Sequence, residues 1–577
     1  MIVERIKQGH AVSKGIGLGR AFVYKRYIPL KKISYIEDKD VESAFARYHE
    51  ILQKAHQEID DIRQSLEQKG DDKAKIFTAH LDILHDIALE EMIEQYIKQE
   101  HFSIAYAVHE AFDMFIEIIG QVEDELIRER VADLKDVKNR VLRIEEGLPE
   151  TNLSRLSEPS IIIADDLYPS DTATLDRTFV EALITEIGGV TSHTAIIAKS
   201  YEIPAILGIE GVMKTIEHGT FVIADAIKGE LIIHPDAKTT DEYTIKKKEY
   251  KAKQTLLKTY LPLKPITQDL IKVEVTLNIG SASDEELSFV PYVDGVGLFR
   301  SEFLYMENDH LPTEDEQYHV YAKALKAFGE KPVILRTLDI GGDKELSYLT
   351  LPKEDNPFLG CRAIRLCFEH PEILKTQLRA ALRASVYGNL WLMFPMVGSI
   401  DDIEKIHHAV GEAKASLDHE NIMYSQNVKV GVMIEIPSLI LIADHVAKMV
   451  DFASIGTNDL CQYLTAVDRL NPLVSSYYQS YSPAMFRIIK MAIDAFNKEH
   501  KPISVCGELG GDPIAAPILL GLGMRKISMA KSSVARIKKI ITSHQMTTFS
   551  QVADHILKLT KEKDVIDYVQ SVLKLED

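Results

Sequence analysis

Residues 188–200, GGVTSHTAIIAKS, place His193 after a tight glycine turn and at the start of an apolar helical stretch. At the start of a helix the backbone N–H groups are free and the helix dipole is positive. This field disfavours the imidazolium, so His193 is expected to stay neutral and nucleophilic. The same amides could hold a phosphoryl group carried by the imidazole. A histidine that only caps the helix or fills the core is the alternative, and the segment alone leaves both open.

A regular alternation of short apolar runs and helical segments begins at about residue 262. The runs that read as strands are 273–279, 295–300, 333–338, 390–396, 430–436, 452–456, 503–507 and 526–530. Eight strands with helical crossovers predict a (β/α)8 barrel, in which catalytic groups follow the carboxyl ends of the strands. Polar residues stand at or just after the carboxyl ends of the predicted strands, as this fold requires of catalytic groups. They are Arg300, Glu302, Arg336, Asp339, Glu435, Asn458, Asp459, Cys506 and Glu508.

Four arginines of the predicted barrel have the chemistry to bind a small molecule that carries both a phosphate and a carboxylate. They are Arg300, Arg336, Arg362 and Arg469. Such a molecule needs several forked donors, and arginines at strand ends are poor core residues unless they bind an anion. Surface salt bridging is the alternative for any one of them.

Two carboxylates and one thiol complete the candidate chemistry of the barrel. Glu435 and Asp459 end adjacent predicted strands, and beside a phosphate site they suggest Mg²⁺, whose other ligands would be substrate oxygens and water. Pairing of these carboxylates with the arginines is the alternative, and the sequence does not exclude it. Cys506, in VCGEL, reads either as a small core residue or as an acid that faces the pocket.

The first half of the chain must position His193, and its pattern differs from that of the barrel. Apolar stripes at helical spacing over 37–146 predict a bundle of about four helices with acidic polar faces. Short β-like runs return over about 150–235 and predict a small α/β domain, to which a strand at 20–25 would belong if the bundle is an insertion. Residues 236–258 are polar and predict a connecting helix.

Composition restricts the class of protein. A chain of 577 residues with 46% hydrophobic and 27% charged residues predicts three or four folded domains. Its formal net charge of −20 disfavours nucleic acid as a partner and is compatible with a basic protein partner. The four cysteines form no close pair, and we find neither a signal peptide nor an apolar run of membrane length. A cytoplasmic protein without membrane insertion is therefore expected.

Several motifs carry a specific resemblance. GGVTSHTAIIAKS resembles the phosphohistidine signature of the phosphoenolpyruvate-utilising enzymes, and DFASIGTNDLCQYLTAVDR (451–469) resembles the second signature of that superfamily. Further blocks, in order, are GVGLFRSEFLYM, LRTLDIGGDKELSY, NPFLGCRAIR, FPMVGSIDDIEKI and VCGELGGD. Together they resemble Enzyme I, the phosphoenolpyruvate–protein phosphotransferase family of the bacterial sugar phosphotransferase system. The resemblance runs nearly end to end and includes the helical segment.

The resemblance implies a role for each matching residue. His193 would be the phosphorylated nucleophile, with Thr172 and Lys199 in contact with its phosphate, and Cys506 would protonate the enolate. Phosphoenolpyruvate would be bound by Arg300, Arg336, Arg362, Asn458 and Arg469. Glu435 and Asp459 would hold Mg²⁺. The helical segment would bind the phosphocarrier protein HPr, and the barrel would form a homodimer.

The expected architecture is a multidomain α/β protein. Residues 1–28 and 148–236 would form the swivelling phosphohistidine domain, 29–147 the inserted helical HPr-binding domain, 237–261 a linker helix, and 262–577 the (β/α)8 barrel. Two alternatives to the sugar-uptake enzyme exist. A regulatory, nitrogen-type paralogue usually carries an extra N-terminal sensor domain, and an ATP-using synthase or dikinase carries a nucleotide-binding domain. Neither feature is evident in the sequence, which favours the sugar pathway.

Overall fold

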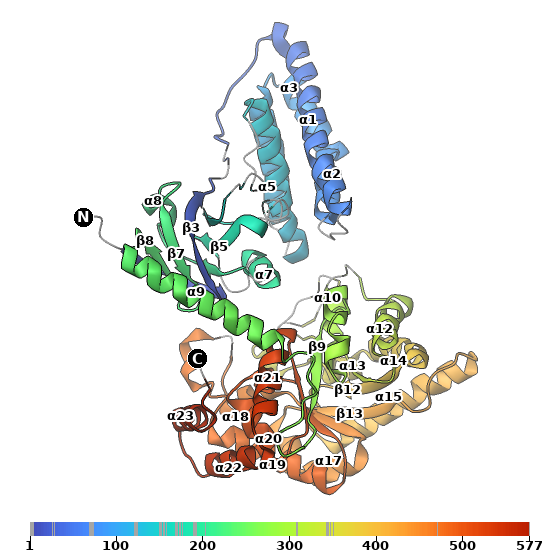
Figure 1. Cartoon of the computed structure of the whole chain (residues 1–577). Coiled ribbons are helices and arrows are strands. Elements are labelled where there is room, and N and C mark those ends of the chain that lie inside the picture. The colour runs from blue at the N-terminus through green and yellow to red at the C-terminus, as the bar shows by residue number, and fades with distance from the viewer. Residues whose placement is uncertain are drawn as a thin grey trace. The chain divides into compact units, whose positions relative to one another are not determined.

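The computed structural model divides the chain into two compact units, Met1–Gln254 and Thr255–Asp577, which are described separately (Figure 1). The residues that the structure describes are 5–25, 27, 29–68, 74–120, 125–148, 153, 156, 158–167, 171, 175, 177–188, 193–201, 203–306, 308, 310–341, 346, 348–349, 351–352, 354–469 and 471–575.

An eight-stranded sheet organises the first unit, with the strand order β1-β8-β7-β3-β4-β5-β6-β2. Its strands are β1 (Arg5–Gln8), β2 (His10–Ser13), β3 (Ile16–Val23), β4 (Ser160–Ala164), β5 (Val180–Thr185), β6 (Ala205–Leu207), β7 (Phe221–Asp225) and β8 (Glu230–Ile233). Strand β3 pairs in parallel with β4, although the whole helical segment separates them in sequence. The prediction that the early strand belongs to the later α/β domain is therefore confirmed. Strands β1 and β2 were not predicted.

The helical segment contains α1 (Val41–Gln68), α2 (Ala74–Leu84), α3 (Ile87–Lys98), α4 (Ile104–Gly120) and α5 (Glu125–Glu145). The prediction of about four helices merged α2 and α3, because the apolar stripe continues across their junction. The chain breaks there at Asp86, whose extended backbone ends one helix and whose carboxylate accepts the backbone N–H of Leu89 at 2.9 Å. This side chain caps α3 and so fixes its start.

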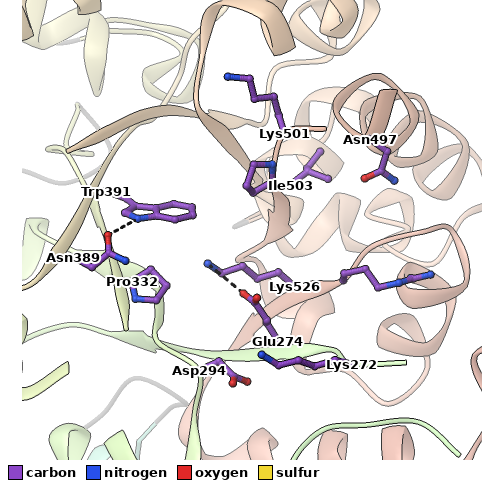
Figure 2. A pocket seen from close by; sticks show the side chains of 12 residues that line it. Lys272, Glu274, Asp294, Pro332, Asn389, Trp391, Asn497, Lys501, Ile503 and Lys526 are labelled. Carbon is purple, nitrogen blue, oxygen red and sulfur yellow. Dashed lines mark hydrogen bonds and ion pairs between the residues drawn. The ribbon is translucent and has the colours of Figure 1, made fainter. Parts of the chain in front are cut away.

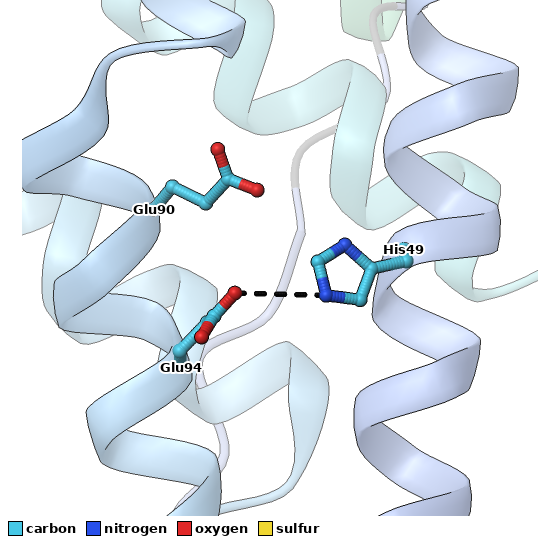
Figure 3. A group of neighbouring side chains, drawn as sticks. All are labelled: His49, Glu90 and Glu94. Atoms are coloured by element: carbon cyan, nitrogen blue, oxygen red, sulfur yellow. Dashed lines mark ion pairs between the residues drawn. The ribbon is translucent and has the colours of Figure 1, made fainter.

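Apolar packing and polar contacts both join α1 to α3. Ile51 and Ile59 of α1 and Ile93 of α3 are fully or almost fully buried in the core of this bundle. At the edge of the contact, His49 Nε2 of α1 lies 3.5 Å from Glu94 Oε1 of α3, beside Glu90 one turn earlier (Figure 3). Part of the acidic face is therefore engaged inside the bundle.

Among the described residues near the sheet are also α7 (His193–Ser200) and α8 (Val212–Thr215), and α9 (Ala237–Lys258) follows β8. The predicted connecting helix is confirmed as α9. It contacts the sheet through Tyr243, whose hydroxyl donates to Asp225 Oδ2 at 3.1 Å, and through an ion pair between Lys247 and Glu181.

A closed barrel of eight parallel strands forms the second unit, as the alternation of strands and helices predicts. The strands are β9 (Glu274–Ile279), β10 (Val296–Arg300), β11 (Pro332–Arg336), β12 (Asn389–Phe394), β13 (Lys429–Ile434), β14 (Phe452–Ile455), β15 (Ile503–Val505) and β16 (Lys526–Met529). All eight predicted strands are present, and pairing of β16 with β9 closes the barrel. Buried side chains inside it include Trp391, Met433 and Cys506.

The barrel helices surround these strands and bury an extensive apolar core. They are α10 (Asp284–Leu287), α11 (Glu302–Met306), α12 (Glu314–Phe328), α13 (Ile364–Glu369), α14 (Pro371–Ala384), α15 (Ile400–His419), α16 (Pro437–Leu441), α17 (Ala443–Met449), α18 (Thr457–Thr465), α19 (Pro483–Lys498), α20 (Ala515–Gly521), α21 (Lys531–Ser543), α22 (Met546–Ile556) and α23 (Glu562–Leu573). Across the described residues, no helix has both the length and the apolar character that crossing a membrane requires.

The Asp86 cap provides a test of the helical segment. Asp86→Ala should lower the free energy of unfolding of this segment by about 1 kcal/mol, because the amide of Leu89 loses its acceptor. Denaturant unfolding followed by circular dichroism measures the change. Asp82→Ala, which removes an exposed carboxylate from the last turn of α2, is the control and should change stability by less than about 0.5 kcal/mol. Equal losses in the two variants would contradict the capping role.

Candidate active site

The histidine segment begins a helix where the sequence predicts one. Helix α7 starts at His193, shortly after Gly188, which has a positive φ of 116°. The buried hydroxyl of Thr194 lies 3.1 Å from the carbonyl oxygen of Leu167 and 3.3 Å from Asp166 Oδ1, and these contacts tie the first turn to the end of β4. Lys199 is exposed on the same helix. The His193 side chain and all of Thr172 lie outside the described residues.

The barrel brings the other predicted site residues to the carboxyl ends of its strands. Arg300 and Arg336 are the last residues of β10 and β11 and are direct partners in the strand register. Glu435 follows β13, and Cys506 follows β15. Asn458 and Asp459 lie in the first turn of α18, directly after β14. The predicted placement of these residues at the carboxyl ends of the strands is therefore present in the fold.

Buried ion pairs hold two of the arginines in place. Arg336 forms an ion pair with Glu302, and its Nη1 lies 2.8 Å from Asp339 Oδ2. Arg362 Nη2 lies 3.1 Å from the other oxygen of Asp339, so one carboxylate joins both guanidinium groups. Burial opposes the charge of Arg336, but Asp339, Glu302 and Glu435 together hold its pKa above the ordinary value. The alternative of surface salt bridging is wrong for this pair, since both arginines are buried.

Some N–H donors of the site arginines are not used by described residues and could bind a ligand. Arg336 Nε is buried and makes no hydrogen bond within the described part of the chain. Arg300 is half-buried, and no described residue accepts a hydrogen bond from it. An arginine in this position needs an acceptor, which an anionic ligand would supply.

A phenyl ring lies near the other two arginines. The guanidinium carbons of Arg362 and Arg469 are 5.4 and 5.9 Å from the ring centroid of Phe358. Tyr463 donates its hydroxyl to the backbone carbonyl of Phe358 at 2.6 Å and so fixes this loop. Sequence reasoning did not identify Phe358 or Tyr463 as site residues, although Phe358 stands in the NPFLGCRAIR block.

The two predicted metal ligands form a buried acidic pair. Glu435 Oε1 accepts the backbone N–H of Met396 at 2.6 Å, whereas its Oε2 is buried without a hydrogen bond among the described residues. Asp459 Oδ1 lies 3.2 Å from Arg469 Nη1 but makes no hydrogen bond of good geometry. Burial, then Asp459 and Asp339, raise the pKa of Glu435 to about 8. Two close carboxylates with unused oxygens match the ligand set of a divalent cation.

A glycine leaves the room that this acidic pair requires. A side chain at Gly456 would place its Cβ 2.7 Å from Glu435 Oε2. The residue lies directly between β14 and α18, three positions before Asp459, and its missing side chain leaves space for Glu435 Oε2.

Cys506 is buried at 2% exposure and remains a thiol. Its Sγ lies 3.6 Å from the carbonyl oxygen of Ile455, to which the thiol donates. Burial is the main reason that the pKa of this thiol rises to about 11, although Arg336 acts in the opposite direction. A protonated sulfur at a strand end can serve as an acid. Asn458 contributes an amide at the same end of the barrel. Its Nδ2 donates to Glu508 Oε1 and its Oδ1 accepts the backbone N–H of Glu508, both at 3.3 Å.

Comparison with known families identifies the class. Three models of phosphoenolpyruvate-utilising enzymes match this chain: the N-terminal domain over 8–130, the mobile domain over 156–229 and the PEP-binding domain over 254–546. The fold and the site are thus those of a phosphoenolpyruvate-utilising enzyme.

Full-length relatives identify one family within this class of enzymes. The phosphoenolpyruvate-protein phosphotransferase of Priestia megaterium is 44% identical over 570 residues, covering 98% of this chain and 99% of that protein. The phosphotransferase of the same name from Bacillus subtilis is 42% identical over 568 residues, with 98% and 99% covered. A solved structure of an Enzyme I protein, nEIt, aligns at 38% identity over 42% of this chain and 99% of its own, with a TM-score of 0.40. The chain belongs to the phosphoenolpyruvate-protein phosphotransferase family.

The room at Gly456 leads to a prediction about the acidic pair. Gly456→Ala should weaken binding of Mn²⁺, measured by calorimetry, at least about tenfold, because the added methyl group displaces Glu435 Oε2. Gly411→Ala is the matched control, since its added methyl group would meet no atom within 4 Å. Unchanged Mn²⁺ affinity in a folded Gly456→Ala protein would show that these carboxylates do not form the cation site.

Proposed function

We propose that this chain transfers the phosphoryl group of phosphoenolpyruvate to its own His193 and then to a histidine of the phosphocarrier protein HPr, releasing pyruvate. This reaction would be the first step of sugar uptake by a phosphotransferase system. The observation that carries the proposal is the barrel mouth, where arginines and carboxylates gather at the strand ends of a member of this family. The full-length relatives, named as protein phosphotransferases, do not favour the regulatory or the ATP-using alternative.

The arginines would bind the two anionic groups of phosphoenolpyruvate. Arg300, Arg336, Arg362 and Arg469, with the amide of Asn458, would supply donors to the phosphate and the carboxylate. Glu302 and Asp339 already fix the orientation of Arg336 and Arg362, so little side-chain entropy would be lost on binding. The buried position of both groups strengthens their interaction with an anion.

Glu435 and Asp459 would hold a divalent cation, which we propose is Mg²⁺. Bound there, it would neutralise negative charge on the phosphoryl oxygens of the substrate. The unused oxygens of both carboxylates and the raised pKa of Glu435 support this assignment.

In the transfer itself, the imidazole nitrogen of His193 would attack the phosphorus atom. The N–P bond forms while the P–O bond to the enol oxygen breaks, and its electron pair leaves as pyruvate enolate. The Cys506 thiol would donate its proton to the methylene carbon of that enolate, giving pyruvate, and the resulting thiolate would regain a proton from water. Thr172 and Lys199 would contact the phosphate on His193.

Domain boundaries and assembly complete the proposal. We place the phosphohistidine domain at 1–28 plus 148–236, the helical HPr-binding domain at 29–147, the linker helix at 237–261 and the barrel at 262–577. The β3–β4 pairing and the extent of α9 support these limits. A homodimer through the barrel is proposed from the family alone. The four free cysteines support a reducing, cytoplasmic location.

Labelled phosphoenolpyruvate tests this function. With Mg²⁺, the wild-type protein should acquire acid-labile, alkali-stable label, as expected for phosphohistidine, and His193→Ala should acquire none. Added HPr should remove the label from the wild type. Label that persists on His193→Ala, or an absence of label on folded wild-type protein, would contradict the proposal.

A further inference from the structure

A cavity of about 420 Å³ lies at the amino-terminal end of the barrel, opposite the strand ends that carry the active site. Figure 2 shows the side chains that line it. Its walls include the first residues of five strands, Glu274, Pro332, Asn389, Ile503 and Lys526. No residue of the candidate active site lines it. The volume is within the range of small-molecule sites in proteins.

The charge of this cavity contrasts with that of the chain. Four cationic side chains line it, Lys272, Lys501, Arg525 and Lys526, against two carboxylates, Glu274 and Asp294. One carboxylate is partly engaged, because Asp294 Oδ2 accepts the backbone N–H of Val275 at 3.0 Å. A cationic cavity in a protein of net charge −20 favours an anionic ligand.

Lys526 is the central group of the cavity. The residue is 6% exposed, and its ammonium points into the space between Glu274 and Trp391 (Figure 2). Its closest described carboxylate oxygen, on Glu274, is 3.9 Å away, and no described residue accepts a hydrogen bond from it. Burial lowers the pKa of this ammonium. The ammonium forms a long ion pair with Glu274 but makes no hydrogen bond to a described residue, so its N–H donors are open to an acceptor in the cavity.

A second lysine, Lys429, adds positive charge next to Lys526 and so makes a nearby anion more favourable. The ammonium groups of Lys526 and Lys429 lie 4.6 and 4.1 Å from the centroid of the Trp391 ring. Trp391 itself is held by Asn389, whose Oδ1 accepts the indole N–H at 2.9 Å. The indole attracts both cations, but they repel each other, and an anion bound to Lys526 on the pocket side would reduce that repulsion.

We propose that this cavity, which we name the basal pocket, binds a small oxyanion that carries a phosphate or carboxylate group, with Lys526 as its principal ligand. The site is separate from the phosphoenolpyruvate site in its residues and its position in the barrel. Trp391 is the only tryptophan of the chain, so its fluorescence reports directly on the basal pocket.

The test is titration of the full-length protein with inorganic phosphate or with malonate, at constant ionic strength maintained with chloride, which corrects for general screening. We expect a saturable change in tryptophan fluorescence with at least one of the two anions, and the anion that gives it identifies the group bound. Lys526→Met should weaken binding at least about tenfold, because a charge-assisted hydrogen bond is lost. Lys501→Met, at the half-buried edge of the pocket, should weaken it less.

Two controls locate the response. Lys429→Met removes a cation beside Trp391 that does not line the pocket, and should keep the affinity within about threefold. Arg300→Met, in the proposed phosphoenolpyruvate site, should leave the titration unchanged. The proposal is overturned if neither anion gives saturation, if both lysine variants that line the pocket bind as the wild type does, or if Arg300→Met abolishes the response.

Discussion

Burial of charge at the carboxyl end of the barrel is the constraint on which the site depends. Two arginines and two carboxylates lie almost out of contact with water in the network of Glu302, Arg336, Asp339 and Arg362. Removing any one of them would leave an uncompensated charge in a medium of low dielectric. The closed ring of strands meets this constraint, since it places Arg300 and Arg336 in register and holds the carboxylate partners of Arg336 within a few ångströms.

The same end of the barrel has an acidic side that is less fully compensated, since the ion pair described there joins only Asp459 to Arg469. Glu435 Oε2 and Asp459 Oδ1 are buried without a hydrogen bond among the described residues, and burial, with the nearby charge of Asp459, raises the pKa of Glu435. A network of buried arginine–carboxylate ion pairs beside two carboxylates with unused oxygens suits a ligand that carries both a cation and anionic groups. Gly456 maintains the required space.

The barrel and the site at the carboxyl ends of its strands could be predicted because the same sequence pattern, an apolar run followed by polar residues, is repeated along this part of the chain. Eight apolar runs of similar length fix the strands, and polar residues after them share one phase, so an error at one strand would not change the fold. The strands β1 and β2 were missed because runs of four residues carry too little alternation to be distinguished from turns. The break at Asp86 was missed because a capping interaction does not interrupt the apolar stripe.

The residues that pair with the site arginines were harder to predict from the sequence than the positions of the arginines themselves. The sequence places Arg336 and Arg362 at the site, but it does not reveal that Asp339 joins them, because Arg362 follows Asp339 by 23 residues and reaches it only in the fold. Phe358 and Tyr463 were missed for the same reason. The basal pocket has no local motif, since five strands contribute one residue each at their starts.

We propose that residues of the barrel carry out the enolate chemistry without His193, with Cys506 as the acid. The most direct measurement is incorporation of deuterium into the methyl group of pyruvate in deuterated water with Mg²⁺, followed by nuclear magnetic resonance. Exchange is the reverse of enolate protonation, so the wild type and His193→Ala should both catalyse it and Cys506→Ala should not. Equal exchange by a folded Cys506→Ala protein, or loss of exchange in His193→Ala, would contradict the claim.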